Sequence, residues 1–302
     1  MTDHQHRPAQ LINRAKSPAV ALETTLLVHG LPTDQALTVA DQLDQAVTKG
    51  GSNPALVGVV QGSPVVGMTR DELQSLMSQG PVPKLNTSNL GHALFTKSHG
   101  ATTVSTTMEL AHRAGVRVFA TGGIGGVHKD SHLTHDISAD LFALTRNRIA
   151  VVTSGCKNIL DIRGTREMLE TLGVPVVGYQ TDVFPAFYQR RTDLPVDAVF
   201  DEPAELAAYL AFELARNPRG IVVANPIPTS AEIAQDEWDN WLKEAQSLPS
   251  VKAAAGRDAT PALLAEVHRI SKGRTVEANI ALALANASLA GRLAPAIMPK
   301  KR

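Results

Sequence analysis

Short runs of apolar residues alternate along the chain with longer segments in which apolar residues recur every three or four positions. The short runs predict buried strands over residues 55–60, 116–120, 149–153, 174–177 and 220–224. The longer segments predict helices over residues 33–50, 103–114, 158–172, 202–216, 231–245, 260–272 and 276–292. Strands that are apolar throughout predict a sheet covered on both faces. The fold class is therefore α/β, an α/β/α sandwich with a largely parallel or mixed central sheet.

A single domain is predicted for the whole chain. A length of 302 residues is compatible with two domains at about 150 residues each, but composition does not shift along the sequence and no internal repeat is present. We therefore expect residues 1–302 to form one catalytic domain. The two ends, residues 1–16 and 293–302, are polar or irregular and are expected to be loose tails.

Composition excludes several classes of protein. The 29 basic side chains balance the 29 acidic ones, which argues against a nucleic-acid or membrane-surface partner. The single cysteine, Cys156, excludes an intrachain disulfide and any multi-cysteine metal site. We found neither a signal peptide nor an apolar run of roughly 18 residues. A cytoplasmic protein that acts on small molecules is the expectation.

Candidate chemistry lies in the loops that follow the predicted strands, because ligands of open α/β sheets bind beyond the carboxyl ends of the strands. The loop Thr121–Gly126 has four glycines. Its backbone N–H groups predict a phosphate-binding nest, and a tight turn without a ligand is the alternative. The loop lacks the third glycine of a dinucleotide fingerprint and the Lys and Ser/Thr of a Walker A motif.

Two ionisable residues stand out by position. Lys157 lies in a turn of small residues between a strand and a helix, where it is either a surface lysine or a functional amine. Such an amine forms a Schiff base only when it is neutral, which burial or a nearby cation favours. Glu23 is a lone carboxylate in an apolar stretch. It is either a paired structural residue or a buried acid with a raised pKa.

A cluster of His128, His132, His135 and Asp136 has two interpretations. One is a metal site with three histidine ligands. The other, which we favour, is a partly hydrated Mg²⁺ or Mn²⁺ held by an aspartate, because hard cations prefer oxygen ligands.

Taken together, these residues resemble the pseudouridine-5′-phosphate glycosidase family, also called the indigoidine synthase A-like family. The resemblance runs from Ala21 to Ala294. The stretches that carry it are ALETT around Glu23, His29-Gly30, GATTV at 100–104, ATGGIGGVHK at 120–129, DISADL at 136–141, TSGCKNILD at 153–161, GYQTD and FPAFY at 178–188, ANPIP at 224–228 and EANIALAL at 277–284.

The resemblance implies a reaction. The family reversibly cleaves the C–C glycosidic bond of pseudouridine 5′-phosphate to uracil and ribose 5-phosphate, uses a divalent metal that is typically Mn²⁺, and forms homotrimers. By resemblance, Lys157 is the nucleophile that forms an imine at C1′ of the opened sugar, and Glu23 is the acid or base that opens the ring and protonates uracil. Asp136 would hold the metal. The implied substrate-binding residues are Lys84, Val104, Thr121, Gly122, Gly123, Ser138, Ala139, Asp140 and Asn279.

One segment departs from the family pattern. The family reads K-x-S-R-R-D-L where this chain has Lys84-Leu-Asn-Thr-Ser-Asn-Leu90, so two arginines and an acid are replaced by neutral polar residues. Neutral side chains cannot replace a bidentate arginine contact with phosphate. Three alternatives therefore stay open: a relative that attaches ribose to another aromatic base, a Schiff-base phosphosugar aldolase, and a phosphosugar-binding protein without activity.

Overall fold

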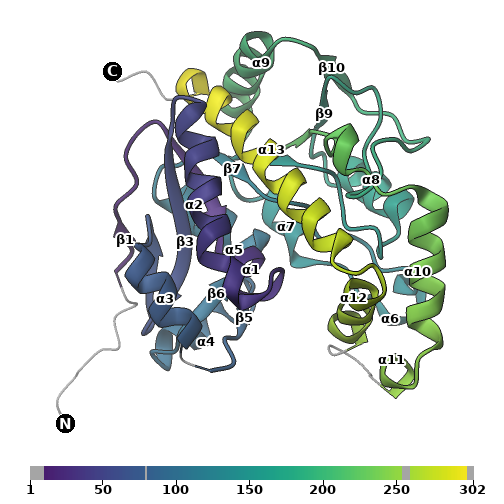
Figure 1. The fold of residues 1–302 in the computed structure, drawn as a ribbon. Helices are drawn as coiled ribbons and strands as arrows, with labels where there is room; N and C mark the ends of the chain where they lie inside the picture. The colour runs from purple at the N-terminus through teal and green to yellow at the C-terminus, as the bar shows by residue number, and fades with distance from the viewer. Residues whose placement is uncertain (1–9, 79, 254–258, 298–302) are drawn as a thin grey trace.

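The computed structural model describes residues 10–78, 80–253 and 259–297, and a continuous sheet runs through its centre (Figure 1). Its strands are β1 (Ile12–Asn13), β2 (Ala19–Glu23), β3 (Asn53–Val60), β4 (Ser63–Val66), β5 (Lys84–Leu85), β6 (Gly100–Thr102), β7 (Val118–Ala120), β8 (Ala150–Thr153), β9 (Val176–Tyr179), β10 (Ala198–Phe200) and β11 (Ile221–Ala224). They lie in the order β1-β4-β3-β2-β7-β8-β11-β9-β10, with β6 on β3 and β5 on β6.

The sheet is mostly parallel, as predicted. Among the described strands, β3 pairs antiparallel with β4 and β6. The pairs β2–β3, β2–β7, β7–β8, β8–β11 and β9–β11 are all parallel. The carboxyl ends of β2, β7 and β8 therefore meet at one edge, where Glu23, Thr121 and Ser154 follow one another across the sheet.

Helices cover both faces of the sheet. They are α1 (Thr24–His29), α2 (Thr33–Lys49), α3 (Arg70–Ser78), α4 (Leu90–Phe95), α5 (Val104–Arg113), α6 (Ser131–Thr134), α7 (Ala139–Leu144), α8 (Ile162–Thr171), α9 (Pro203–Arg216), α10 (Gln235–Ser247), α11 (Pro249–Ala253), α12 (Ala259–Ile270) and α13 (Arg274–Ile297), with a 3₁₀ turn at Thr229–Ala231. Helices α2, α9 and α13 pack on one face, while α5, α7 and α8 pack on the other.

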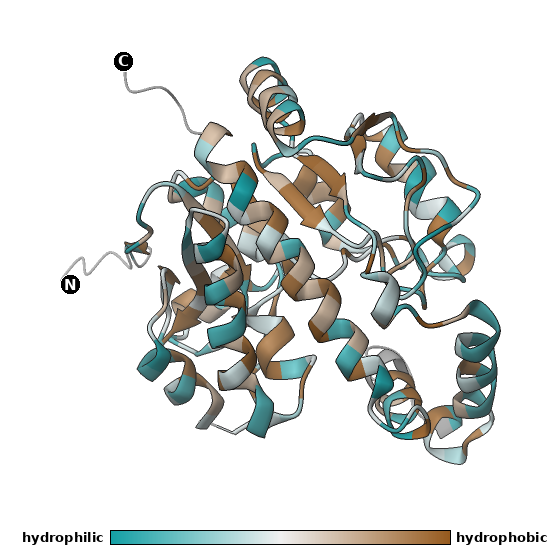
Figure 2. Ribbon diagram, turned by 45° about the horizontal axis from the view of Figure 1, so that its top comes forward, coloured by the Kyte–Doolittle hydropathy of each residue, from teal (hydrophilic) through white to brown (hydrophobic). Residues whose placement is uncertain are grey.

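Successive strand residues feed two separate cores. Val20 and Leu22 of β2 point into the core under α2 and α13, whereas Ala19 and Ala21 point into the core under α5. The strands are apolar on both faces, as their hydrophobic colouring in Figure 2 shows. This arrangement confirms the predicted three-layer sandwich.

Helix α13 is the longest element of the described chain, at 24 residues. By length and hydropathy alone it is long and apolar enough to cross a membrane, which the sequence did not lead us to expect. It nevertheless runs diagonally across the sheet between α2 and α9, and Leu282, Ala287 and Leu293 are buried there (Figure 1). Its apolar composition is therefore explained by packing in the protein core.

The expectation of loose ends is wrong for the parts that the structure describes. Ile12–Asn13 pairs with β4, and Arg14 forms an ion pair with Glu72 at 2.8 Å. At the other end, Leu293 and Ile297 are buried in α13. Residues 1–9 and 298–302 lie outside the described residues.

Two predicted helices begin later than their patterns indicated. The segment predicted from residue 158 becomes helical only at Ile162, because Asp161 caps α8 by accepting a hydrogen bond from the Gly164 amide at 2.8 Å. Asn158, which precedes it, lies in a loop, where its Oδ1 accepts a hydrogen bond from the Tyr188 amide at 3.1 Å. The helix predicted from residue 231 begins at Gln235, after the 3₁₀ turn.

Candidate active site

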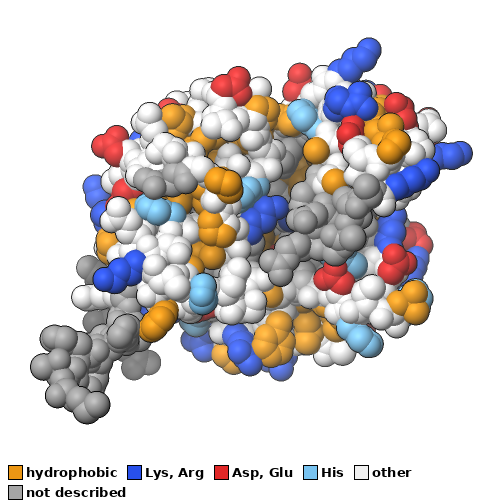
Figure 3. All heavy atoms as spheres, turned by 90° about the horizontal axis from the view of Figure 1, so that it is seen from below, with side chains coloured by type: hydrophobic (Ala, Val, Ile, Leu, Met, Phe, Trp, Pro, Cys, Tyr) orange, Lys and Arg blue, Asp and Glu red, His pale blue; other side chains and the backbone are white. Residues whose placement is uncertain are grey.

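A cavity of about 510 Å³ opens where β2, β7 and β8 end. Its floor includes Glu23, Gly122 and Gly123, and Lys84 and Lys157 line its sides. Helices α1, α12 and α13 complete the wall. Viewed from below, the molecule is hollowed near the middle of this face, where basic and His side chains lie among hydrophobic ones (Figure 3). Six of the residues predicted to form the site therefore line this cavity, and Thr121 adjoins it through its hydrogen bond to Glu23.

Glu23 is a buried acid, as one of the two interpretations predicted. It is the last residue of β2, only 8% of its surface is exposed, and the Thr121 hydroxyl donates a hydrogen bond to its Oε1. Burial raises the pKa of Glu23 to about 7, and the positive charge of Lys157 opposes that rise. A carboxyl group with this pKa exchanges protons readily near neutral pH.

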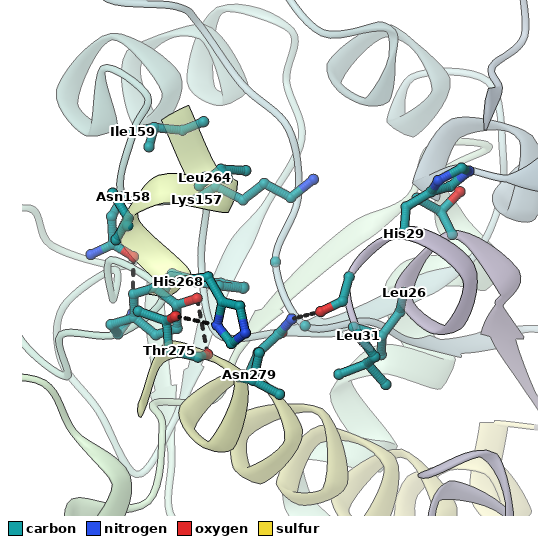
Figure 4. A pocket seen from close by; sticks show the side chains of 18 of the residues that line it. Leu26, His29, Leu31, Lys157, Asn158, Ile159, Leu264, His268, Thr275 and Asn279 are labelled. Atoms are coloured by element: carbon teal, nitrogen blue, oxygen red, sulfur yellow. Dashed lines mark hydrogen bonds between the residues drawn. The ribbon is translucent and has the colours of Figure 1, made fainter. Parts of the chain in front are cut away.

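Lys157 projects into the cavity from the loop after β8 (Figure 4). The loop is tightly held: Gly155 has a φ of +83°, and a Cβ there would lie 1.8 Å from the Pro185 carbonyl oxygen. The Lys157 amide donates to the Ile124 carbonyl at 3.3 Å. The side chain is exposed rather than buried. A second lysine, Lys84, lines the same cavity.

Lys84 lies on β5, opposite the Glu23 strand end. Burial and the charge of Lys157 lower the pKa of Lys84, while Glu23 acts in the opposite direction. Two asparagines of the segment that departs from the family pattern form hydrogen bonds with its backbone. Asn86 Oδ1 accepts from the Ser88 amide at 2.9 Å, and Asn89 Nδ2 donates to the Lys84 carbonyl at 3.0 Å. No arginine lines the cavity within the described part of the chain.

The glycine loop is for the most part a packed turn. The Ile124 amide donates to the Gly155 carbonyl at 3.0 Å, and the Gly125 amide donates to Asp140 Oδ2 at 2.8 Å. A Cβ on Gly126 would lie 2.2 Å from the Thr165 hydroxyl. The prediction of a phosphate nest over the whole loop is therefore wrong for residues 124 and 125, because their amides already have hydrogen-bond acceptors. Gly122 and Gly123 alone of this loop line the cavity.

Four residues predicted to bind substrate lie away from the cavity wall. Val104 and Asp140 are buried, and the Asp140 carboxylate accepts bonds from the amides of Ser105 at 2.9 Å and Gly125 at 2.8 Å. Ser138 caps α7 by accepting from the Asp140 amide, and Ala139 is the first residue of that helix. In this chain Asp140 positions the glycine loop, and contact of these four residues with substrate stays a prediction.

The histidine cluster does not form a metal centre. Among the described residues, no group of three or more His, Cys, Asp or Glu side chains is placed to hold an ion, so the three-histidine interpretation is wrong. The Asp136 carboxylate is 62% exposed, and His128 Nδ1 lies 3.7 Å from it. A hydrated divalent cation held by Asp136, the interpretation favoured from the sequence, stays a prediction.

Sequence reasoning missed the residue that ties the loops together. Asn286 of α13 is fully buried, and its Nδ2 donates to the Thr121 carbonyl at 2.8 Å and to the Ser154 hydroxyl at 3.2 Å. Its Oδ1 accepts from Asn225 Nδ2 at 2.8 Å. One side chain thus joins the loops after β7, β8 and β11. The available signal was a polar residue inside an otherwise apolar helix.

The remaining wall combines apolar surface with unpartnered oxygens. Trp238, Tyr188 and Leu264 line one end of the cavity. Thr25 Oγ1 and Asn279 Oδ1 are buried at its wall and have no hydrogen-bond partner among the described residues. Buried polar atoms are normally paired, so the Asn279 oxygen indicates a ligand with a hydrogen-bond donor, and the Thr25 hydroxyl, which can donate or accept, indicates a polar ligand group.

Comparisons with known proteins agree over nearly the whole chain. The family model described as "Indigoidine synthase A like protein" matches residues 9–296. A pseudouridine-5′-phosphate glycosidase of Nocardioides sp. is 42% identical over 282 residues, which cover 93% of this chain and 92% of the relative. A protein of the same name from Methylobacterium nodulans is 44% identical, over 94% of this chain and 84% of the relative.

Two solved structures share the fold. An indigoidine synthase A-like protein of Thermotoga maritima superposes with a TM-score of 0.87 and 33% identity, covering 97% of this chain and 98% of the other. The prealnumycin C-glycosynthase AlnA, in complex with ribulose 5-phosphate, superposes with a TM-score of 0.85 and 35% identity over 93% of this chain and 91% of AlnA. This chain belongs to the indigoidine synthase A-like family.

Proposed function

We propose that the protein is a pseudouridine-5′-phosphate glycosidase that reversibly releases uracil and ribose 5-phosphate. The observation that carries the proposal is the meeting of Glu23, Lys84 and Lys157 in one cavity, within a chain 42% identical to relatives of that name. The oxygens of Thr25 and Asn279 that have no hydrogen-bond partner among the described residues suit a substrate rich in hydroxyl and N–H groups.

The roles follow from what a C–C glycosidic bond requires. Uracil C5 is a poor leaving group, so the sugar ring must open before the bond can break. Glu23, whose pKa burial raises to about 7, gives a proton to the ring oxygen as the bond from that oxygen to C1′ breaks. As the ring opens, the uracil ring supplies electrons to C1′, and the Lys157 amine then adds to C1′ and passes its extra proton to Glu23. Glu23 gives that proton to uracil C5, the C1′–C5 bond breaks, and the nitrogen lone pair forms the protonated imine, which water hydrolyses to ribose 5-phosphate.

In this proposal, Lys84 binds the phosphate group of the substrate. Lys84 is the remaining cation among the described residues that line the cavity, once Lys157 is assigned to the sugar. A lysine holds phosphate as a point charge and an arginine holds it with a bidentate pair, so we expect weaker phosphate recognition here than in relatives with the two arginines.

A divalent cation, Mn²⁺, is part of the proposal. Asp136 would hold it with water as the other ligands. Binding of Mn²⁺ measured by calorimetry should give one site per chain in the wild type and none in Asp136→Asn. Asp71→Asn, an exposed carboxylate on α3, is the control.

A second candidate is a C-ribosylating enzyme that uses another aromatic base. Two observations favour it: the neutral Asn86–Asn89 segment and the likeness to AlnA. Ribose 5-phosphate incubated with a panel of aromatic acceptors would reveal such an activity as a new C-glycoside detected by mass spectrometry.

The experiment that tests the main proposal is uracil release from pseudouridine 5′-phosphate with Mn²⁺. The wild type should release uracil, and Lys157→Ala should not. Trapping of an imine without uracil release would indicate the phosphosugar aldolase. Binding without trapping would indicate a protein that only holds the phosphosugar. Both results would contradict the glycosidase.

We also propose that the protein is a cytoplasmic homotrimer. Leu133, Ile137 and Phe142 are 75%, 42% and 52% exposed, and they lie close together in sequence around α6 and α7. Large apolar side chains gathered in one region of a surface are typical of contacts between subunits. Their position beside Asp136 would place the proposed metal near that contact.

A further inference from the structure

His29 lines the cavity, but the mechanism above gives it no role. It is the last residue of α1, and Figure 4 shows it across the cavity from Lys157, whose side chain extends toward that side. It also borders a smaller, neighbouring cavity of about 300 Å³ formed with Val28, Met77 and Val82. His29 and Lys157 therefore lie on opposite sides of the same cavity.

The surroundings of His29 define its protonation state. Partial burial and the charge of Lys84 lower the pKa of His29, so the ring is neutral near pH 7. A hydrogen bond to the Val82 backbone occupies one ring nitrogen as a donor. The other nitrogen is then an acceptor, because the partner of one nitrogen determines the tautomer.

The other titratable groups of the cavity are engaged differently. Glu23 lies at the strand end, and the Thr121 hydroxyl donates a hydrogen bond to its Oε1. His268 of α12 has its Nδ1 3.4 Å from the Thr275 hydroxyl. His29 is therefore the neutral proton acceptor on the side of the cavity opposite Lys157.

We propose that His29 is a further catalytic residue, which moves a proton within the adduct between Lys157 and the opened sugar. The inference rests on the proposed function, because it requires an imine at Lys157. It assigns a chemical role to the His29-Gly30 motif that the sequence comparison singled out.

The step is balanced without a further reactant. The lone pair of the Lys157 amine forms the N–C1′ bond, and the π electrons of the C1′ carbonyl move to its oxygen. The adduct then carries a positive nitrogen and a negative oxygen. The free nitrogen of His29 takes one proton from the adduct nitrogen and gives it to the adduct oxygen, which restores the neutral imidazole. The resulting hydroxyl later leaves as water when the imine forms.

The test is the rate at which borohydride traps ribose 5-phosphate on the protein. His29→Gln keeps an amide N–H for Val82 but cannot accept a proton. We expect it to trap about 10²-fold more slowly than the wild type, a typical contribution of acid–base catalysis. Added imidazole should restore much of the rate in His29→Ala. His92→Gln, an exposed histidine on α4, should trap at the wild-type rate.

The outcomes separate this inference from the function on which it rests. If the wild type traps no sugar, the proposed function fails. If the wild type traps sugar and His29→Gln traps it equally fast, the function stands and the role of His29 is overturned. A slow His29→Ala that imidazole does not rescue, in a protein whose circular dichroism is unchanged, also overturns proton transfer by this residue.

Discussion

At the scale of single residues, the cavity maintains a carboxyl group in an environment that opposes its charge. Glu23 is buried at a strand end and forms no ion pair within 4.0 Å among the described residues. Its raised pKa costs stability wherever the group must ionise, and such costs are common where function needs a strained site. This cost has a sign and a pH range that can be measured.

We predict that Glu23→Gln stabilises the protein at alkaline pH. The folded-state pKa of Glu23 is about 7, against a model value of 4.5, so the folded protein binds the proton more tightly. The stability from this group is present below pH 4.5 and is lost as pH rises through 7, by about 3 kcal/mol. Urea unfolding should show that the free energy of unfolding falls less between pH 5 and pH 8 in Glu23→Gln than in the wild type.

The same variant should lose activity. Gln can still accept the Thr121 hydrogen bond but cannot donate a proton to carbon or to the ring oxygen. An equal pH dependence of unfolding in Glu23→Gln and the wild type would contradict the buried-acid account. Asp71→Asn, an exposed substitution, provides the baseline for the comparison.

The site residues that could be predicted from the sequence stand out against the residues next to them in the chain. Glu23 interrupts an apolar run, and Lys157 follows a strand in a turn of small residues. Asn286 and His29 could not be assigned in the same way. Asn286 donates a hydrogen bond to the Thr121 carbonyl, 165 residues earlier in the sequence. The role proposed for His29 depends on its position across the cavity from Lys157. Only the folded chain brings such partners together.

At the scale of elements, helices α2 and α13 can cross closely because glycines, which have no side chain, lie at the contact. A Cβ on Gly291 would lie 2.5 Å from the Val47 carbonyl oxygen, and one on Gly50 would lie 2.6 Å from the Gly291 backbone. The Ser52 hydroxyl donates to the Gly291 carbonyl at 2.7 Å. Helix α13 also carries Asn286 and Asn279, so this close contact positions the cavity wall.

We predict that Gly291→Ala destabilises the protein by about 1–3 kcal/mol, the usual cost of overpacking, because two backbones must separate. The matched control is Gly91→Ala in α4, where a Cβ meets nothing within 4 Å. The control should be neutral or slightly stabilising, as alanine favours helix. Chemical denaturation measures both. Equal stability of the two variants would show that the helix crossing is not tight.

Elements were predictable where periodicity was long and clear, as in the helix from Thr33 and the strands β7, β8 and β11. The apolar pattern did not predict the five-residue strand β2, although Glu23 within it stands out as a lone carboxylate. The sequence predicts helix for the loop before α8 because Ile159 and Leu160 continue its apolar pattern. The hydrogen bond from the Tyr188 amide to the Asn158 side chain, rather than local propensity, holds this segment as a loop.

At the scale of the whole molecule, the exposed apolar residues around α6 and α7 lead to a prediction of assembly. Light scattering should give three times the chain mass of 32.1 kDa. The double variant Leu133→Asp, Phe142→Asp should lower that mass, because charged side chains oppose burial at a contact. Phe212→Asp, equally exposed on α9, is the control. A wild-type mass equal to one chain would contradict the trimer.

The central claim is that Lys157, rather than the neighbouring Lys84, forms the covalent bond with the sugar. The most direct measurement is borohydride reduction during turnover of pseudouridine 5′-phosphate, followed by peptide mass mapping. The account predicts one reduced sugar phosphate per chain, attached at Lys157. An adduct on Lys84, or uracil release with no adduct at either lysine, would contradict it.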